Sequence, residues 1–86
     1  MGDEGISKLA TIIGSVGVAL LLLAFLLNMT KLASAEGVPY LALNFVGGAL
    51  ALTSSWLIDF IPFVVLEVVW TAAALAGLVR ALTRSA

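Results

Sequence analysis

One acidic residue lies inside an otherwise uncharged apolar run near the C-terminus, and its type and place make it the first candidate for chemistry. Glu67 is the only charged residue in the stretch 60–79. If that stretch crosses a membrane, the side chain costs roughly 2.5 kcal/mol or more to insert, so it should face protein or water and not lipid. Two readings stay open. Glu67 either orients helices through a polar contact or forms part of a substrate or proton site.

Other polar and aromatic residues could share a site with Glu67. Trp70 and Thr71 follow it at spacings of three and four residues, which places them on the same face of a helix. Asn28 and Asn44 fall at the same end of their predicted helices, and we expect them to hydrogen-bond to each other. The predicted substrate or proton site therefore has six members: Glu67, Trp70, Thr71, Asn28, Asn44 and Ser55.

The inventory of reactive side chains argues against an enzyme. The chain has no Cys and no His. This excludes a disulfide framework, a thiolate or imidazole metal site, and a Ser-His or Cys-His catalytic pair. The net charge of −1 leaves no basic face for nucleic acid. We expect no catalytic residue, no metal, no cofactor and no nucleic-acid partner.

Three uncharged or nearly uncharged runs supply the elements that must position these residues. They are residues 9–30, 37–58 and 60–79, in a chain that is 63% hydrophobic and 10% charged. A soluble domain of 86 residues buries too little surface to hide so many apolar side chains. Each run is about 30 Å long as a helix, which matches the hydrocarbon core of a bilayer. The sequence predicts an all-α, three-helix transmembrane bundle, a single membrane domain over residues 1–86 with helices at about 9–30, 38–58 and 61–82.

The connections between these runs are short, so the helices should run up, down and up. Asp59 is a plausible N-cap for the third helix. Ala33-Ser34-Ala35 resembles a signal-peptidase site, but the preceding apolar run exceeds the usual ~7–15 residues of a signal peptide, so we expect a retained helix. Lys8 lies on one side of the membrane, and Lys31, Arg80 and Arg84 lie on the other. The positive-inside rule then predicts an external N-terminus and a cytoplasmic C-terminus.

Small residues recur at helical spacing along all three runs. In lipid, helices associate through small residues that let their backbones approach closely. Plain helix packing is the favoured interpretation of these residues, and closure around a narrow polar path is the alternative. The positions predicted to pack are Gly14, Gly17, Gly47, Gly48, Ala51 and Ala74.

Most of the chain resembles a family of small, uncharacterised bacterial membrane proteins, the CBU-like domain family. The resemblance covers roughly residues 14–82 and rests on an "LN-x-x-G-A" helix, a short acidic turn and a "P-x-x-x-x-E-x-x-W" helix. The matching residues are Leu43, Asn44, Gly47 or Gly48, Asp59, Pro62, Glu67 and Trp70. This resemblance implies a multi-pass protein of the bacterial inner membrane.

A looser similarity runs to the bacterial half-transporters of the SWEET and PQ-loop type, which are three-helix chains that dimerise around a sugar path. Leu27-Asn28 stands where those proteins place Pro-Gln, and Glu67 stands where they place a pocket Asn. The likeness implies a homodimeric half-transporter for a small solute. The alternative is a structural or accessory membrane protein that binds partner helices or lipid.

Overall fold

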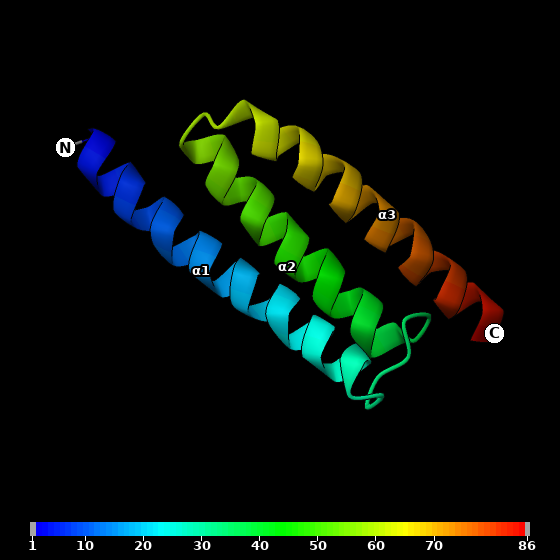
Figure 1. The fold of residues 1–86 in the computed structure, drawn as a ribbon. Helices are drawn as coiled ribbons and strands as arrows, with labels where there is room; N and C mark the ends of the chain where they lie inside the picture. Colours follow the sequence, from blue (N-terminus) through cyan, green and yellow to red (C-terminus); the bar gives the residue numbers. More distant parts are fainter. Residues whose placement is uncertain (1, 86) are drawn as a thin grey trace.

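The computed structural model describes residues 2–85, with side chains described from Glu4 to Arg84. It consists of three helices, α1 (Gly2–Met29), α2 (Val38–Leu57) and α3 (Ile61–Ser85). They run antiparallel, so the start of α1 and the α2–α3 turn lie at one end and the α1–α2 connection and the end of α3 at the other (Figure 1). Met1 and Ala86, the ends of the predicted domain, lie outside the described residues.

All three helices are long and apolar enough to cross a membrane, over Glu4–Met29, Val38–Leu57 and Ile61–Arg84. The prediction of an all-α chain with three such helices is confirmed. Two predicted boundaries were too narrow, because α1 begins at Gly2 and not at residue 9, and α3 continues to Ser85 and not to residue 82. Charged residues end an apolar run without ending a helix, since Lys, Arg and Glu are good helix formers.

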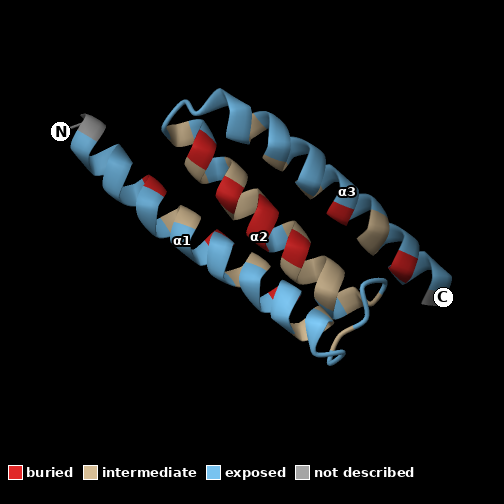
Figure 2. Ribbon diagram, in the orientation of Figure 1, coloured by how far each residue is buried: buried red, intermediate tan, exposed pale blue. Residues whose placement is uncertain are grey.

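The helices form a layer and not a closed bundle. α2 packs against both neighbours, whereas α1 and α3 do not pack against each other in the described part of the chain. The buried positions accordingly gather on α2, as Figure 2 shows. The buried residues of α2 are Asn44, Gly47, Gly48, Ala51 and Ser55. Small residues on two faces of α2 allow both neighbours to approach it closely, which makes α2 the central helix.

The buried hydrophobic residues are all alanines: Ala10, Ala24, Ala51, Ala74 and Ala81. No large side chain is fully buried among the described residues, and large apolar side chains on all three helices point outward. Phe25, Val65 and Trp56 are examples, with Trp56 69% exposed. An aqueous protein buries such side chains, whereas a protein in lipid keeps small residues between its helices. This distribution therefore fits a lipid environment.

Both connections begin with the same type of helix ending. The amides of Lys31 and Leu32 donate to the carbonyls of Asn28 and Leu27, which is the Schellman pattern. At the end of α2, Asp59 and Phe60 donate to Trp56 and Ser55 in the same way. The second residue after each of these helices has a left-handed backbone, with φ of 65° at Lys31 and 59° at Asp59.

The prediction that Asp59 caps α3 is therefore wrong. Asp59 belongs to the ending of α2, and Asp is among the residues that tolerate a left-handed backbone. Phe60 stands directly before α3, and its carbonyl accepts from the amides of Phe63 and Val64.

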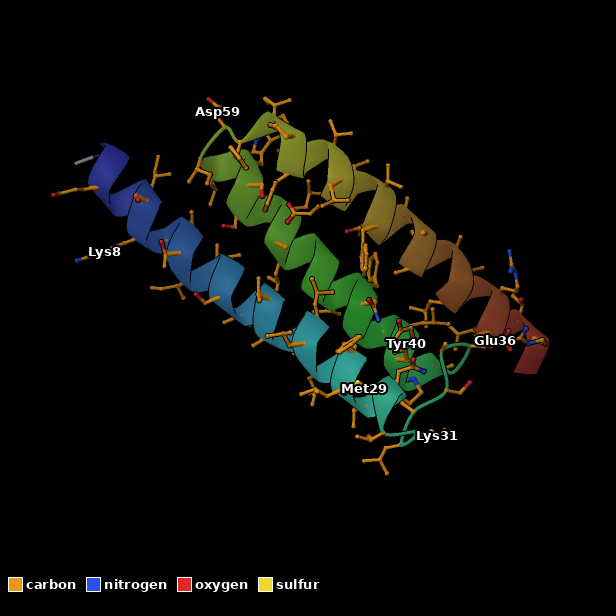
Figure 3. All side chains as sticks on the ribbon, viewed as in Figure 1. Lys8, Met29, Lys31, Glu36, Tyr40 and Asp59 are labelled. Atoms are coloured by element: carbon orange, nitrogen blue, oxygen red, sulfur yellow. The ribbon has the colours of Figure 1, made fainter. Side chains whose placement is uncertain are left out.

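Charged side chains are separated along the layer. Lys8 and Asp59 lie towards one end, and Lys31 and Glu36 lie at the other (Figure 3). Arg80 and Arg84 are near Glu36, at the end where α3 finishes. The charge map used for the orientation is thus compatible with the arrangement of the helices, and the direction of insertion stays a prediction.

Candidate functional site

The interface between α1 and α2 is a close contact of two backbones. A Cβ added at Gly17 would lie 2.8 Å from both the Gly47 carbonyl oxygen and the Ala51 amide nitrogen. A Cβ at Gly47 would lie 2.9 Å from the Gly17 carbonyl oxygen. Backbone has no rotamer with which to move away, so both positions need glycine. Gly17, Gly47 and Ala51 are all buried.

A side-chain hydrogen bond adds to this contact near the start of α1. The Ser54 hydroxyl donates to the carbonyl oxygen of Ala10 at 2.7 Å. Gly14 makes room for it, because a Cβ there would lie 2.7 Å from the Ser54 oxygen. Ser54 was not among the predicted site residues. It lies seven positions after Gly47, and that spacing returns to the same helix face.

The interface between α2 and α3 is instead built from polar side chains. The Ser55 hydroxyl donates to Glu67 Oε1 at 2.7 Å. The Trp70 indole nitrogen donates to Asn44 Oδ1 at 3.1 Å, and the Asn44 amide donates to the Tyr40 carbonyl oxygen at 2.8 Å. The structure thus brings together four of the six predicted site residues as two pairs, each joining α2 to α3.

Thr71 lies in the same interface without a hydrogen bond. Its hydroxyl oxygen is buried and has no partner within the described chain. It faces Gly48, where an added Cβ would lie 2.6 Å from that oxygen. Gly48 therefore lets α3 approach α2 closely, as Gly47 does for α1. Ala74, one turn further along α3, is buried as well.

Asn28 is apart from the other predicted site residues. Its amide donates to the carbonyl oxygen of Ala33 at 3.1 Å, within the connection that follows α1. The expected hydrogen bond between Asn28 and Asn44 is therefore wrong. The reason is local, because a helix end leaves carbonyl and amide groups unpaired, and a nearby Asn side chain binds them before it reaches another helix.

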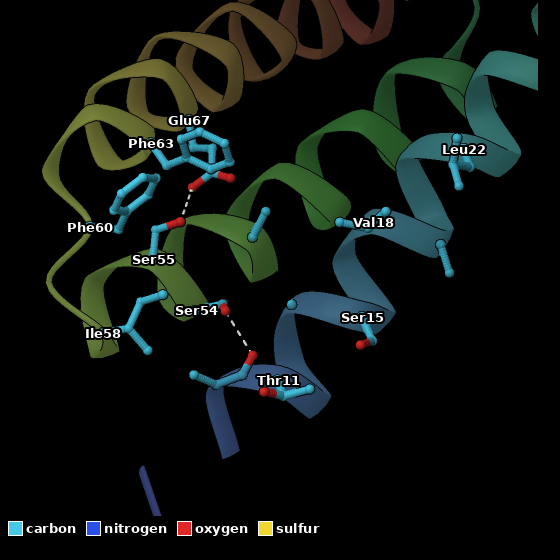
Figure 4. A pocket seen from close by; sticks show the side chains of 14 residues that line it. Thr11, Ser15, Val18, Leu22, Ser54, Ser55, Ile58, Phe60, Phe63 and Glu67 are labelled. Atoms are coloured by element: carbon cyan, nitrogen blue, oxygen red, sulfur yellow. Dashed lines mark hydrogen bonds between the residues drawn. The ribbon is translucent and has the colours of Figure 1, made fainter. Parts of the chain in front are cut away.

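A groove runs along one face of the layer, above α2 and between α1 and α3. It consists of two open hollows, one of about 610 Å³ and one of about 310 Å³. Val18, Leu22 and Glu67 line both hollows. Figure 4 shows the first hollow, with Ser55 and Glu67 bonded on one side and Ser54 bonded to α1 on the other. We refer to the two hollows together as the groove.

The lining of the groove is apolar and aromatic around a single acid. Phe60 and Phe63 line the first hollow, with ring centroids 4.9 Å apart and ring planes at 58°. Phe25, Tyr40 and Trp70 line the second hollow. The predicted site omitted all of these except Trp70. A signal was present for Phe63, because it precedes Glu67 by four residues and so shares its helix face.

A protein-family model matches residues 10–85, which include both helix interfaces and the groove. The chain belongs to this family. The family is small and uncharacterised, and membership confirms the main resemblance predicted from the sequence. No curated protein and no solved structure matches the chain. The looser resemblance to half-transporters has no support from these comparisons.

Proposed function

We propose that two copies of this chain face each other across their grooves and form a path for a small solute, with Glu67 in its wall, through the bacterial inner membrane. The observation that carries the proposal is the groove itself. It is open along one face and is lined by all three helices. Its wall contains Glu67, the single charged residue within the three apolar runs. One copy does not enclose it, and an acid facing lipid is costly.

A second copy of the chain is the simplest partner that could cover the groove. Most oligomers are closed and symmetric, and a twofold axis along the membrane normal keeps both copies in the same orientation. α1 and α3 form the two rims of the groove, so each rim would meet the opposite rim of the partner. The space left between the two copies would then contain two Glu67 side chains.

Glu67 suits a path because only part of its binding capacity is used. Ser55 donates to Oε1, and the other carboxyl oxygen has no hydrogen bond within the described residues. A carboxyl group held on one side and open on the other can accept a proton or a cation and release it. Ser55, Asn44 and Trp70 would act by holding the carboxyl and the adjacent ring in place.

The assembly is tested by cross-linking, because the chain has no native Cys. Ser15→Cys places a thiol on the groove side of α1, and Val46→Cys places one on an exposed part of α2 outside both hollows. We expect a short bismaleimide to link two copies through residue 15 and not through residue 46. Equal linking at both positions, or a purified protein with the mass of one chain, would contradict the proposal.

Transport is tested by flux in proteoliposomes, with a pH gradient and a panel of solutes. Glu67→Gln should abolish flux while leaving the cross-link at residue 15 intact. Thiol labelling of intact cells at Ser7→Cys and Ser85→Cys tests the proposed direction. An impermeant reagent should reach residue 7 and not residue 85.

A structural or accessory role is the second candidate, and one observation favours it. The Ser55–Glu67 and Asn44–Trp70 pairs join α2 to α3 directly, so the polar residues already have a use in holding the layer together. In that case a partner helix would cover the groove. Glu67→Gln should then be nearly silent, because Gln can still accept a hydrogen bond from Ser55.

A further inference from the structure

We infer that the groove binds a bulky lipophilic organic cation, such as an aromatic ammonium or phosphonium ion, with Glu67 as its counter-charge. This inference names the substrate class for the path proposed above and rests on that proposal for its place in transport. Binding itself needs only the groove. The argument has three parts: the charge, the aromatic rings and the shortage of hydrogen-bond donors.

The charge in the groove has one sign. Glu67 is the only acidic or basic side chain that lines either hollow, and no Lys or Arg of the described chain does so. Lys8, Lys31, Arg80 and Arg84 all lie towards the ends of the helices. A half-buried carboxylate with no cation beside it attracts one from outside. An anionic solute would be repelled.

Aromatic rings line both hollows beside the acid. Phe60 and Phe63 form a tilted pair in the first hollow, and Trp70 and Tyr40 line the second. The faces of aromatic rings attract cations, most strongly where water is excluded. A small hydrated ion gains little from such a lining, whereas an ion whose charge is covered by hydrocarbon or rings fits it well.

The groove offers a neutral polar solute two free hydroxyls, those of Ser15 and Tyr40, which have no hydrogen bond within the described residues; its other side-chain donors are already used. The Ser54 hydroxyl donates to Ala10, and the Ser55 hydroxyl donates to Glu67. The Asn44 side chain is bonded through both its oxygen and its nitrogen. A sugar needs several donors and acceptors, and it would compete with these bonds. Hollows of about 610 and 310 Å³ match the size of common small-molecule sites.

Trp70 supplies a direct reporter of binding. The chain has two Trp residues, and Trp56 is exposed and lines neither hollow. Trp56→Phe therefore leaves Trp70 as the only indole. The probe is tetraphenylphosphonium, added to the purified full chain in a nonionic detergent. The matched control probe is tetraphenylborate, which has the same shape and the opposite charge.

We expect saturable quenching of Trp70 by the phosphonium and none by the borate. Glu67→Gln should weaken phosphonium binding at least tenfold, and Glu67→Asp should keep most of it. Glu36→Gln, which removes an exposed acid outside the groove, should leave the affinity unchanged. Equal affinity for the two ions, or an unchanged affinity in Glu67→Gln, would overturn the inference.

The two proposals fail in different ways. Saturable cation binding without flux in proteoliposomes would refute the path and keep the binding site. Flux of some other solute, with no phosphonium binding, would keep the path and refute the substrate class.

Discussion

The two interfaces of α2 join helices by different means. Towards α1, the backbones approach closely at Gly17 and Gly47, and a hydrogen bond from the Ser54 hydroxyl to the Ala10 carbonyl adds to this contact. Towards α3, the contact depends on hydrogen bonds, from Ser55 to Glu67 and from Trp70 to Asn44. At Gly17 and Gly47 the first interface leaves no room for a side chain. The second interface is made of polar groups that can exchange one hydrogen-bond partner for another.

The largest effect should come from adding bulk where the backbones touch. Gly17→Leu forces a side chain into the Gly47 carbonyl and the Ala51 amide, so α1 and α2 must separate. We expect a loss of about 3 kcal/mol in stability, at the upper end for overpacked sites. Thermal unfolding followed by circular dichroism in detergent measures this loss.

Val16→Leu is the matched control for that variant. Val16 is the neighbouring residue on α1 and is 48% exposed, so a larger side chain there meets lipid or detergent. It should unfold at the temperature of the parent chain. If both variants unfolded alike, the close contact of α1 with α2 would have no energetic importance.

The Ser55–Glu67 pair should show a smaller effect. Glu67→Leu removes the acceptor of the Ser55 hydroxyl, which is buried. Interhelical hydrogen bonds in membrane proteins contribute roughly 0.6–2 kcal/mol. A double-mutant cycle with Glu67→Leu and Ser55→Ala should give a coupling energy in that range. Glu67→Gln should retain most of it. A coupling near zero would mean that the two side chains do not hold α3 against α2.

Trp70→Phe should have a smaller effect again, because it removes one neutral hydrogen bond and keeps an aromatic ring. Asn44 Oδ1 loses its donor in this variant. The expected loss is about 0.6 kcal/mol, the average for such bonds between membrane helices. Trp56→Phe is the control, since Trp56 is exposed and its replacement should not change the unfolding temperature. A larger loss at residue 56 than at residue 70 would contradict the assigned bond.

The sequence was sufficient to predict three long apolar helices, because charged residues lie at the ends of every apolar run. It was also sufficient to single out Glu67, the one charge within such a run. It did not determine which neighbour each residue meets. Ser54 and Ser55 are adjacent, yet one bonds α1 and the other bonds Glu67 on α3. Successive residues on a helix point about 100° apart, so a small error in helix rotation changes the partner.

The arrangement of the three helices in a layer could not be predicted from the sequence, for a related reason. Small residues on each helix predict close packing, but they do not say which pair of helices is left apart. That depends on α2 having two small faces, with Gly47 on the side of α1 and Gly48 on the side of α3. The same limit applies to Asn28. Its spacing suggested a partner on the next helix, whereas the carbonyl of Ala33 in the connection was nearer.

The smallest predicted effect is an increase in stability, and it concerns the connection that sets α1 against α2. Lys31 is held left-handed at φ 65° in the Schellman ending of α1. A left-handed backbone costs a residue with a side chain about 1–2 kcal/mol, and glycine avoids this cost while losing about 0.5–1 kcal/mol through its greater freedom when unfolded. Lys31→Gly should therefore stabilise the chain by about 0.5 kcal/mol. Lys8→Gly, inside α1, is the matched control and should destabilise it by about 1 kcal/mol. Thermal unfolding of the two variants should shift in opposite directions from the parent. A shift in the same direction would show that loss of the charge, and not the backbone conformation, sets the stability of this connection.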